Sequence, residues 1–358
     1  MTQRVGFIGT GDPDAEGFAM AYRHASAYQR LDYEIVACAD IVPENAEKFA
    51  AEHGIDEGHV YEEYDAMLDE ADLDVVSITV PPAIHAPAAL ACIRSESVRA
   101  VHCEKPMATT WGESTEMAAA ADRHNVQLTF NHQRRFGAEW QRAKELLDEG
   151  AIGELERVEA AGIDLYDWGT HTFDICNMFV DEASPEWVLG QVDYREENRV
   201  FGVHNENQGL ALFEYDDGVT GLVSTGGPGE GWIDSGFVDC LHRLVGTEGE
   251  IEVNRQWGEP YPPLRMRQAG DDEWRAIEYD EPETNEVNRA IEHAMTALEA
   301  GSEPAIGASN ALRATQLIFG VYESARRRGR VEFPLDIEDH PLEAMVEAGD
   351  LRPVSADD

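Results

Sequence analysis

The sequence predicts a doubly wound parallel α/β domain followed by an α+β domain with a mostly antiparallel sheet. Three observations predict this order. Strand-like and helix-like segments alternate through the first 130 residues, a glycine-rich turn (Gly9-Thr10-Gly11) follows the first strand, and strands joined by short turns follow Gly137. Alternation is typical of parallel strands covered by helices on both faces, whereas short turns join antiparallel strands.

Each element of the first domain, residues 1–130, is predicted from its own pattern. Short apolar and β-branched runs predict strands at Arg4–Ile8, Glu34–Ala39, Val75–Val80, Ala100–Cys103 and Gln127–Phe130. Apolar residues at helical spacing predict helices at Phe18–Arg30, Pro43–His53, Ile84–Arg94 and Glu113–His124.

The second domain, residues 131–358, begins with a predicted helix at Ala138–Glu149. Its predicted strands lie around Leu155–Ala161, Glu186–Tyr194, Gln208–Tyr215, Val219–Ser224 and Gly249–Val253. Two predicted helices follow, at Asn285–Ala300 and Ala308–Arg328. The tail from about 338 to 358 is acidic, and we expect it to be frayed.

Charge sets this chain apart from an ordinary globular protein. Its 358 residues include 71 Asp and Glu against 27 Lys and Arg, a formal net charge of -44. Nucleic acids and anionic membranes are excluded as partners because both are bound through basic patches. At molar salt the Debye length falls to about 3 Å, which would screen this charge. We interpret the composition as adaptation to a salt-rich cytoplasm; a generally acidic protein is the alternative.

The five cysteines are widely spaced and form no C-x-x-C pair, which favours buried reduced thiols over a disulfide framework or a zinc site. The N-terminus enters the first strand without the basic and apolar regions of a signal peptide. No stretch approaches 18 uninterrupted apolar residues. We therefore expect a cytoplasmic protein with no membrane partner.

The turn Gly9-Thr10-Gly11 suits the approach of a pyrophosphate to backbone N–H groups at a helix N-terminus. The full G-x-G-x-x-G pattern is not met, because Asp14 stands at the third glycine position and Gly17 comes three residues late. Acids at Asp12 and Asp14 also lie where phosphates would approach. A plain turn between strand and helix is the alternative.

Asp40 ends the second predicted strand, where an acid can accept hydrogen bonds from both hydroxyls of an adenosine ribose. Such an acid disfavours a 2′-phosphate, and Ile41-Val42-Pro43 offers no arginine to receive one. The sequence therefore favours NAD over NADP, with an ordinary loop aspartate as the alternative.

Two further strands end in residues suited to a ligand site. Thr79-Val80-Pro81-Pro82 closes the third and Glu104-Lys105-Pro106 closes the fourth, and ligands bind beyond the carboxyl ends of parallel strands. Lys105 is one of three lysines, with Lys48 and Lys144, in a chain that otherwise uses arginine. A lysine kept in such a chain suggests a site that needs a compact ammonium group, although a surface lysine is the alternative.

In the segment Asp167–Asp174, spacings of four and three place Asp167, His171 and Asp174 on one helical face. Two carboxylates around an imidazole suit a histidine that carries a proton and is held in one tautomer. They could also bind a metal, although no further His or Cys lies at ligand spacing, and we expect none. A helix-capping aspartate with a core histidine is the structural alternative.

Together these segments resemble the glucose–fructose oxidoreductase/inositol dehydrogenase/MocA family of nicotinamide-dependent oxidoreductases over nearly the whole chain. The pair of E-K-P and D-x-x-x-H at this separation is the most specific part. The matching segments are Val5–Gly11, Pro81-Pro82 with His85, Glu104–Met107, Asn131 with Arg134–Phe136, Lys144–Glu154, Asp167 with His171, and Gly246–Gly249.

The resemblance implies a Rossmann domain followed by an α+β domain whose open-faced sheet commonly joins subunits into dimers or tetramers. It implies reversible hydride transfer between a hydroxyl-bearing carbon of a sugar or cyclitol and the nicotinamide. His171 would be the general base, Lys105 would stabilise charge on the same oxygen, and Asp167 would orient the pair and help to bind substrate.

The remaining site residues also follow from the resemblance. Cofactor-binding residues would be Gly9, Thr10, Gly11, Asp40, Thr79, Pro81, His85, Glu104, Lys105 and Asn131. Substrate-binding residues would be Arg134, Asp167, His171 and His204. The short segment Glu159–Tyr166 departs from many relatives, as does the glycine turn. A sensor without turnover and a glycoside-cleaving enzyme that uses bound NAD transiently are the alternative functions.

Overall fold

The computed structural model describes residues 2–14, 19–226, 240–253 and 261–353. The chain forms two compact units, one made of Met1–Gln133 with Thr284–Leu312 and the other of Arg134–Glu283 with Arg313–Asp358. The segment 284–312, which follows the strands of the second predicted domain in sequence, thus packs with the first unit. The reason is local pairing at the sheet edge: Phe130 N donates to Ile306 O at 3.0 Å, and Gln127 Nε2 donates to Ala294 O at 2.9 Å.

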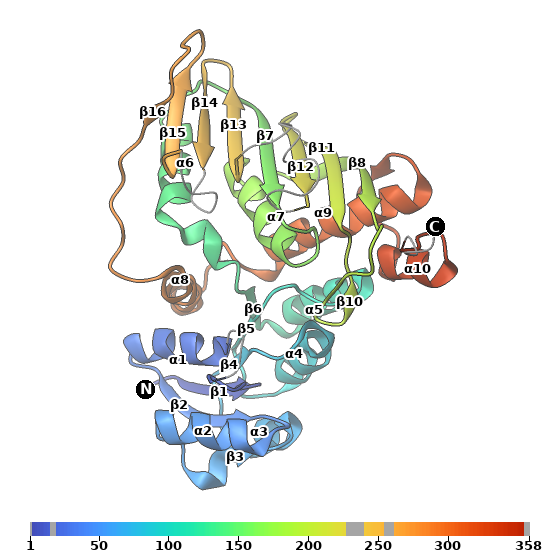
Figure 1. Ribbon diagram of the computed structural model, residues 1–358. Helices are drawn as coiled ribbons and strands as arrows, with labels where there is room; N and C mark the ends of the chain where they lie inside the picture. Colours follow the sequence, from blue (N-terminus) through green and yellow to red (C-terminus); the bar gives the residue numbers. More distant parts are fainter. Residues whose placement is uncertain (1, 15–18, 227–239, 254–260, 354–358) are drawn as a thin grey trace. The chain divides into compact units, whose positions relative to one another are not determined.

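The first unit is built on a six-stranded parallel sheet with the order β3-β2-β1-β4-β5-β6 (Figure 1). The order reverses at β1, so β1 and β4 flank the switch point at which such sheets bind ligands. The strands are β1 (Arg4–Ile8), β2 (Glu34–Ala39), β3 (Val60–Tyr61), β4 (Val75–Ile78), β5 (Ala100–Cys103) and β6 (Gln127–Phe130). All five predicted strands are confirmed, and β3 is additional.

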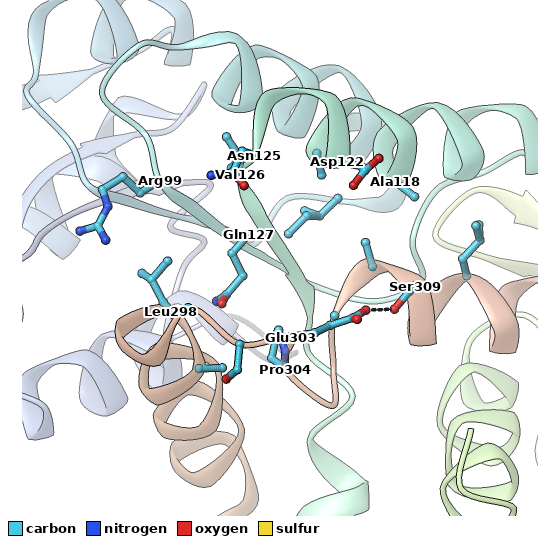
Figure 2. Close-up of a pocket in the computed structure, with 18 residues that line it drawn as sticks. Arg99, Ala118, Asp122, Asn125, Val126, Gln127, Leu298, Glu303, Pro304 and Ser309 are labelled. Carbon is cyan, nitrogen blue, oxygen red and sulfur yellow. Dashed lines mark hydrogen bonds between the residues drawn. The ribbon is translucent and has the colours of Figure 1, made fainter. Parts of the chain in front are cut away.

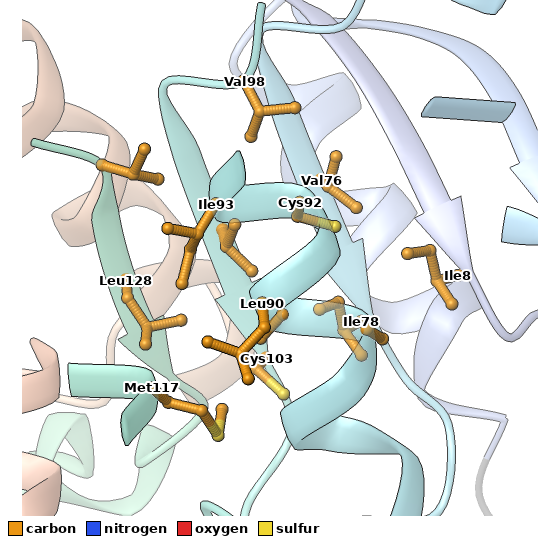
Figure 3. Close-up of a cluster of buried hydrophobic side chains, with 14 of the residues drawn as sticks. Ile8, Val76, Ile78, Leu90, Cys92, Ile93, Val98, Cys103, Met117 and Leu128 are labelled. Carbon is orange, nitrogen blue, oxygen red and sulfur yellow. The ribbon is translucent and has the colours of Figure 1, made fainter. Parts of the chain in front are cut away.

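Helices connect these strands and bury their apolar sides. They are α1 (Met20–Arg30), α2 (Pro43–His53), α3 (Tyr64–Glu70), α4 (His85–Arg94), α5 (Trp111–His124) and α8 (Glu286–Ala300), with the first turn of α9 (Ala308–Arg327). Figure 3 shows the core between β4, β5, β6 and α4, where Ile78, Cys103 and Leu128 meet Leu90 and Ile93. α5 begins with the capping box of Thr110 and Glu113, two residues earlier than predicted.

The second unit contains a nine-stranded sheet with the order β16-β15-β14-β13-β7-β12-β11-β8-β17. Among the described strands of this sheet, only β12 and β7 pair in parallel, so the mostly antiparallel sheet is confirmed. Its strands are β7 (Leu155–Gly162), β8 (Pro185–Asp193), β11 (Gln208–Tyr215), β12 (Thr220–Thr225), β13 (His242–Gly246), β14 (Gly249–Val253), β15 (Leu264–Gln268), β16 (Arg275–Ala276) and β17 (Val331–Glu332). A separate two-stranded ribbon joins β9 (Arg199–Val200) to β10 (Val203–His204).

The two faces of this sheet differ in polarity. One face carries fully buried Val158, Leu244 and Ile251 in register, and α6 (Ala138–Asp148) and α7 (Trp168–Phe179) pack on this unit's strands (Figure 1). We call the other side the open face. Its central row runs across seven strands as Leu189, Leu212, Leu222, Glu159, Arg243, Glu252 and Arg265.

The acidic tail is ordered where the structure describes it, which corrects our expectation of fraying. Helix α10 (Pro341–Ala348) buries Leu342 and Met345, and His340 caps its N-terminus. The His340 ring also stacks on Tyr322 with centroids 5.2 Å apart. Apolar burial therefore outweighs the charge of the tail up to residue 353.

All five cysteines are buried thiols, as predicted. Among the described residues, no helix is long and apolar enough to cross a membrane.

Candidate functional site

The glycine turn follows β1 and depends on backbone conformations that favour glycine. Gly9 has φ +80° and Gly11 has φ +66°, and a Cβ on Gly9 would lie 2.5 Å from Val80 Cγ1. Lys48 on α2 forms an ion pair with Asp12 at 2.8 Å, which offsets one of the acids in the turn. Gly17, the displaced third glycine, lies outside the described residues.

Asp40 holds this turn from the end of β2. Its Oδ2 accepts hydrogen bonds from Thr10 N at 2.8 Å, Thr10 Oγ1 at 2.9 Å and Gly11 N at 3.0 Å. Its Oδ1 accepts from Val42 N at 2.9 Å. The structure thus brings Asp40 together with Thr10 and Gly11, as a cofactor site requires. The same carboxylate also stabilises the conformation of the turn.

The ends of β1, β4 and β5 are tied to one another. Thr79 Oγ1 donates to Gly9 O, and the His85 ring lies 2.7 Å from Pro106 O and 2.8 Å from Val80 O. Burial lowers the pKa of His85. His85 therefore links the turn containing Pro81 to the turn containing Lys105. Its buried ring stabilises these two turns and is not an exposed ligand-binding group.

Glu104 is the centre of a buried polar cluster that sequence reasoning found only in part. Its Oε1 lies 3.0 Å from His24 Nε2 and accepts from Asn131 Nδ2 at 2.7 Å, and the other His24 nitrogen lies 2.8 Å from Ser77 Oγ. Burial acts to raise the pKa of Glu104, but the His24 and Asn131 contacts and the nearby Lys105 charge lower it to about 2. A fixed carboxylate therefore lies beside Lys105.

His24 was missed because it lies within α1, far from the motifs in sequence. The available signal was an isolated histidine on the otherwise apolar face of that helix, next to Ala21, Ala25 and Tyr28. Alone, such a pattern does not separate a core histidine from a site histidine.

These residues fit a nicotinamide dinucleotide. The positive-φ glycines give backbone access at the turn, and Asp40, Thr79 and Glu104 directly follow β2, β4 and β5 of the same parallel sheet. Within the described part of the chain, buried Asn131 Oδ1 has no hydrogen-bond partner, so it can accept from a ligand amide. Lys105 is half-buried at the same strand ends.

In the second unit, α7 carries the D-x-x-x-H motif. Asp167 is half-buried and immediately precedes the helix, and His171, 2% exposed, lies one turn later. Thr170 Oγ1 donates to Asp167 O at 2.8 Å. The motif residues therefore lie on the first turn of a helix that is otherwise packed in the core.

Arg134 joins this end of α7 through Trp168. The Arg134 guanidinium lies 3.9 Å from the centroid of the Trp168 ring, a cation–π contact that places it beside the residue following Asp167. The structure thus brings together three of the four predicted substrate-binding residues. Trp168 itself was not among them, although it stands inside the motif segment.

Asp174 has a different role from the one its spacing suggested. It forms a bidentate pair with Arg135, with Nε to Oδ2 and one terminal nitrogen to Oδ1 both at 2.9 Å, and both side chains are buried. Arg135 also pairs with Glu182 at 2.8 Å. Helical periodicity placed Asp174 on the His171 face but could not show that a buried arginine from the preceding segment neutralises it.

His204 lies on β10, and the structure gives both of its ring nitrogens internal partners. Nδ1 pairs with Tyr194 OH, and Nε2 lies 2.6 Å from an Arg199 terminal nitrogen. His204 is therefore bonded to Tyr194 and Arg199 within its own unit, and its substrate contact stays a prediction.

A hollow of about 830 Å³ lies in the first unit between α5, β6, the end of α8 and the start of α9. Figure 2 shows residues that line it. Arg99, Asp122, Gln127 and Glu303 line it, together with small and apolar residues. None of the predicted site residues lines this hollow, so it is separate from the strand-end site.

Two family models match the chain. The model described as "Oxidoreductase family, NAD-binding Rossmann fold" matches residues 3–132, and the model described as "Oxidoreductase family, C-terminal alpha/beta domain" matches residues 154–333. The matched segments contain the glycine turn, the E-K-P segment and the D-x-x-x-H segment.

Individual relatives are distant. The chain is 25% identical to D-xylose 1-dehydrogenase (NADP(+)) 2 of Haloferax volcanii over 86% of its own length and 94% of the relative's. It is also 25% identical to the uncharacterized oxidoreductase YrbE of Bacillus subtilis, over 52% of this chain and 57% of that protein. The crystal structure of aldose-aldose oxidoreductase from Caulobacter crescentus has a TM-score of 0.75 at 22% identity, covering 93% of this chain and 100% of the other.

Proposed function

Because the chain belongs to the Gfo/Idh/MocA oxidoreductase family, we propose that it oxidises a secondary hydroxyl group of a sugar or cyclitol and passes the hydride to NAD. The presence of Lys105, Asp167 and His171 in one chain supports this proposal most, because a binding protein without turnover needs no proton carrier. When bound, the nicotinamide supplies the hydride acceptor.

The roles of these three residues follow from their chemistry. A carbon that loses hydride requires removal of its O–H proton, and a histidine titrates near the working pH. The Lys105 ammonium would stabilise negative charge on the oxygen that loses this proton. The ionised Glu104 carboxylate lies beside Lys105. Asp167, at the start of α7, would orient the imidazole and contact a neighbouring substrate hydroxyl, and Arg134 on Trp168 would contact another.

The proposed preference for NAD over NADP rests on the negative charge of Asp40. A doubly charged 2′-phosphate would meet this carboxylate, and exposed Ile41 offers no positive charge. The Haloferax relative is named for NADP(+), so this feature would separate the present chain from it.

We also propose that the chain pairs with itself through the open face of the nine-stranded sheet, in a salt-rich cytoplasm. Leu189 and Leu212 are 43% and 39% exposed there, beside the alternating charges Glu159, Arg243 and Glu252. Exposed Leu189 and Leu212 would supply the apolar contact, and a two-fold axis would let each copy present this same patch to the other. The charge of -44 supports the salt-rich setting.

The function is tested with a panel of aldoses, ketoses and inositols, each incubated with NAD or NADP in 2 M KCl while absorbance of the reduced cofactor is followed. Net reduction with at least one panel member, lost in His171→Ala, supports the dehydrogenase. Cofactor binding without turnover on any member supports the sensor. Cleavage of glycosides without net reduction supports the glycoside-cleaving alternative.

A further inference from the structure

Glu206 is a buried carboxyl group that none of the motifs includes. It lies between β10 and β11 and is 1% exposed. Its Oε1 accepts from Leu165 N at 2.6 Å and from Thr225 Oγ1 at 3.0 Å, and its Oε2 accepts from Tyr322 OH at 2.7 Å. It therefore links β12 and α9 to the turn that precedes α7.

A second buried acid, Asp164, also accepts hydrogen bonds from that turn. Its Oδ1 accepts from Asp167 N at 2.7 Å and from Trp168 N at 3.0 Å. These N–H groups are among those that a helix leaves unbonded at its start, and the Asp167 side chain does not cap them. Glu206 and Asp164 thus bond three backbone N–H groups of the turn that leads into the catalytic helix.

The two acids lie in one low-dielectric environment. Titratable groups near them among the described residues include Tyr166 from the turn, Tyr322 from α9 and His340 from the cap of α10. Burial lowers the pKa of His340 to about 3, so it is neutral near pH 7. Burial, followed by the charge of Asp164, raises the pKa of Glu206 to about 7. Like charges this close do not ionise together without cost.

We propose that Glu206 is a positioning residue: its carboxyl group fixes the turn Asp164–Trp168 and thereby sets the positions of Asp167 and His171. Ionisation of Glu206 adds a negative charge that the Asp164 charge repels, and we expect this repulsion to loosen the turn. The consequence for turnover rests on the proposed function, whereas the consequence for the turn does not.

A purely structural role would make Glu206 one more buried group whose loss lowers overall stability. Two variants separate the possibilities. Glu206→Gln keeps the size and an accepting oxygen but cannot ionise, and Glu206→Ala removes every contact. Glu323→Gln is the matched control, because Glu323 is 2% exposed in the same unit and forms its ion pairs with Arg326 and Arg327 of its own helix.

The first measurement is hydrogen exchange followed by mass spectrometry on the full-length protein in 2 M KCl, with rates corrected for intrinsic pH dependence. In Glu206→Ala we expect residues 164–171 to exchange about tenfold faster than in the wild type, while peptides from β7 are unchanged. Glu206→Gln and Glu323→Gln should match the wild type at pH 6. Above pH 7 the wild type should lose protection at this turn, and Glu206→Gln should not.

The second measurement is steady-state turnover on a panel substrate. A misplaced catalytic turn should lower kcat of Glu206→Ala about tenfold to a hundredfold, with the cofactor KM within about twofold of the wild type. Unchanged exchange at 164–171 in Glu206→Ala, or an equal change in Glu323→Gln, overturns the proposal. If Glu206→Ala does not fold, Tyr322→Phe is measured in its place. Unchanged exchange of residues 164–171 in Tyr322→Phe would then contradict the proposal. A wild type without turnover refutes the proposed function but leaves the exchange result decisive for Glu206.

Discussion

Asp40 and Thr10 are joined by two hydrogen bonds to one carboxylate oxygen, from the backbone N–H at 2.8 Å and from the hydroxyl at 2.9 Å. Gly11 N adds a third bond to the same oxygen. Asp40 Oδ2 is therefore committed to the glycine turn, and Oδ1, which accepts from Val42 N, retains capacity for a ribose hydroxyl. The acid acts on cofactor choice through its charge as well as through hydrogen bonding.

The first prediction concerns cofactor preference. Asp40→Ser combined with Ile41→Arg replaces a negative charge by a positive one, and should move the ratio of kcat/KM for NAD over NADP toward NADP by at least about tenfold. Asp40→Ala alone should weaken both cofactors, because the turn loses its three bonds. Titration of both cofactors in 2 M KCl measures this. A wild type that already prefers NADP contradicts the Asp40 argument.

The second prediction concerns proton transfer. His171→Ala should lower kcat by about 10²–10⁴ and leave NAD affinity nearly unchanged, as expected for a positioned acid–base group. Lys105→Arg should also lose activity, because a planar guanidinium does not fit a site for a compact ammonium. Lys144→Arg is the matched control, since Lys144 pairs with Asp148 and Asp181 on the surface. Near-normal turnover of His171→Ala or of Lys105→Arg would contradict the catalytic role proposed for that residue.

The third prediction links Glu206 to stability. The pKa of this group is raised from 4.5 to about 7 by burial and by Asp164. Between pH 4.5 and 7 the folded chain holds a proton that the unfolded chain has released, so rising pH favours unfolding. The free energy of unfolding of the wild type should fall relative to Glu206→Gln, by at most about 1.4 kcal/mol per pH unit in this window. Urea denaturation of both proteins measures it; parallel pH curves are the contrary result.

The fourth prediction concerns salt. With a net charge of -44, the folded state at low ionic strength holds many like charges within one Debye length, and unfolding separates them. Thermal melts from 0.1 to 3 M KCl should show the melting temperature rising through the molar range, with sedimentation reporting subunit association in parallel. Simple screening would instead saturate by about a few tenths molar. A flat melting temperature refutes salt adaptation.

The fold could be predicted largely from local patterns, because parallel strands and their helices carry clear periodicity. β13 and β15 were missed because their apolar positions alternate with arginines, Arg243 and Arg265, whose partners Glu159 and Glu252 lie on other strands. The packing of segment 284–312 with the first unit is likewise invisible to local patterns, because Phe130 and Ile306 pair across a long sequence separation.

The site shows the same limit. Motif positions identified Glu104, Lys105 and Asp167, but not the buried groups that hold them, since His24 and Glu206 approach only through tertiary contacts. Asp174 shows a related limit, because helical spacing gives its face on the helix but not its bidentate pair with Arg135, which comes from a segment outside the helix.

The central claim is direct hydride transfer from a substrate carbon to the nicotinamide, and deuterium tracing tests it. The panel substrate that reacts is labelled with deuterium at the carbon bearing the oxidised hydroxyl, and the reduced cofactor is isolated and analysed by mass spectrometry. The account predicts one deuterium per reduced nicotinamide and an equal amount of oxidised sugar. Deuterium released to water, or sugar converted without net cofactor reduction, would contradict it.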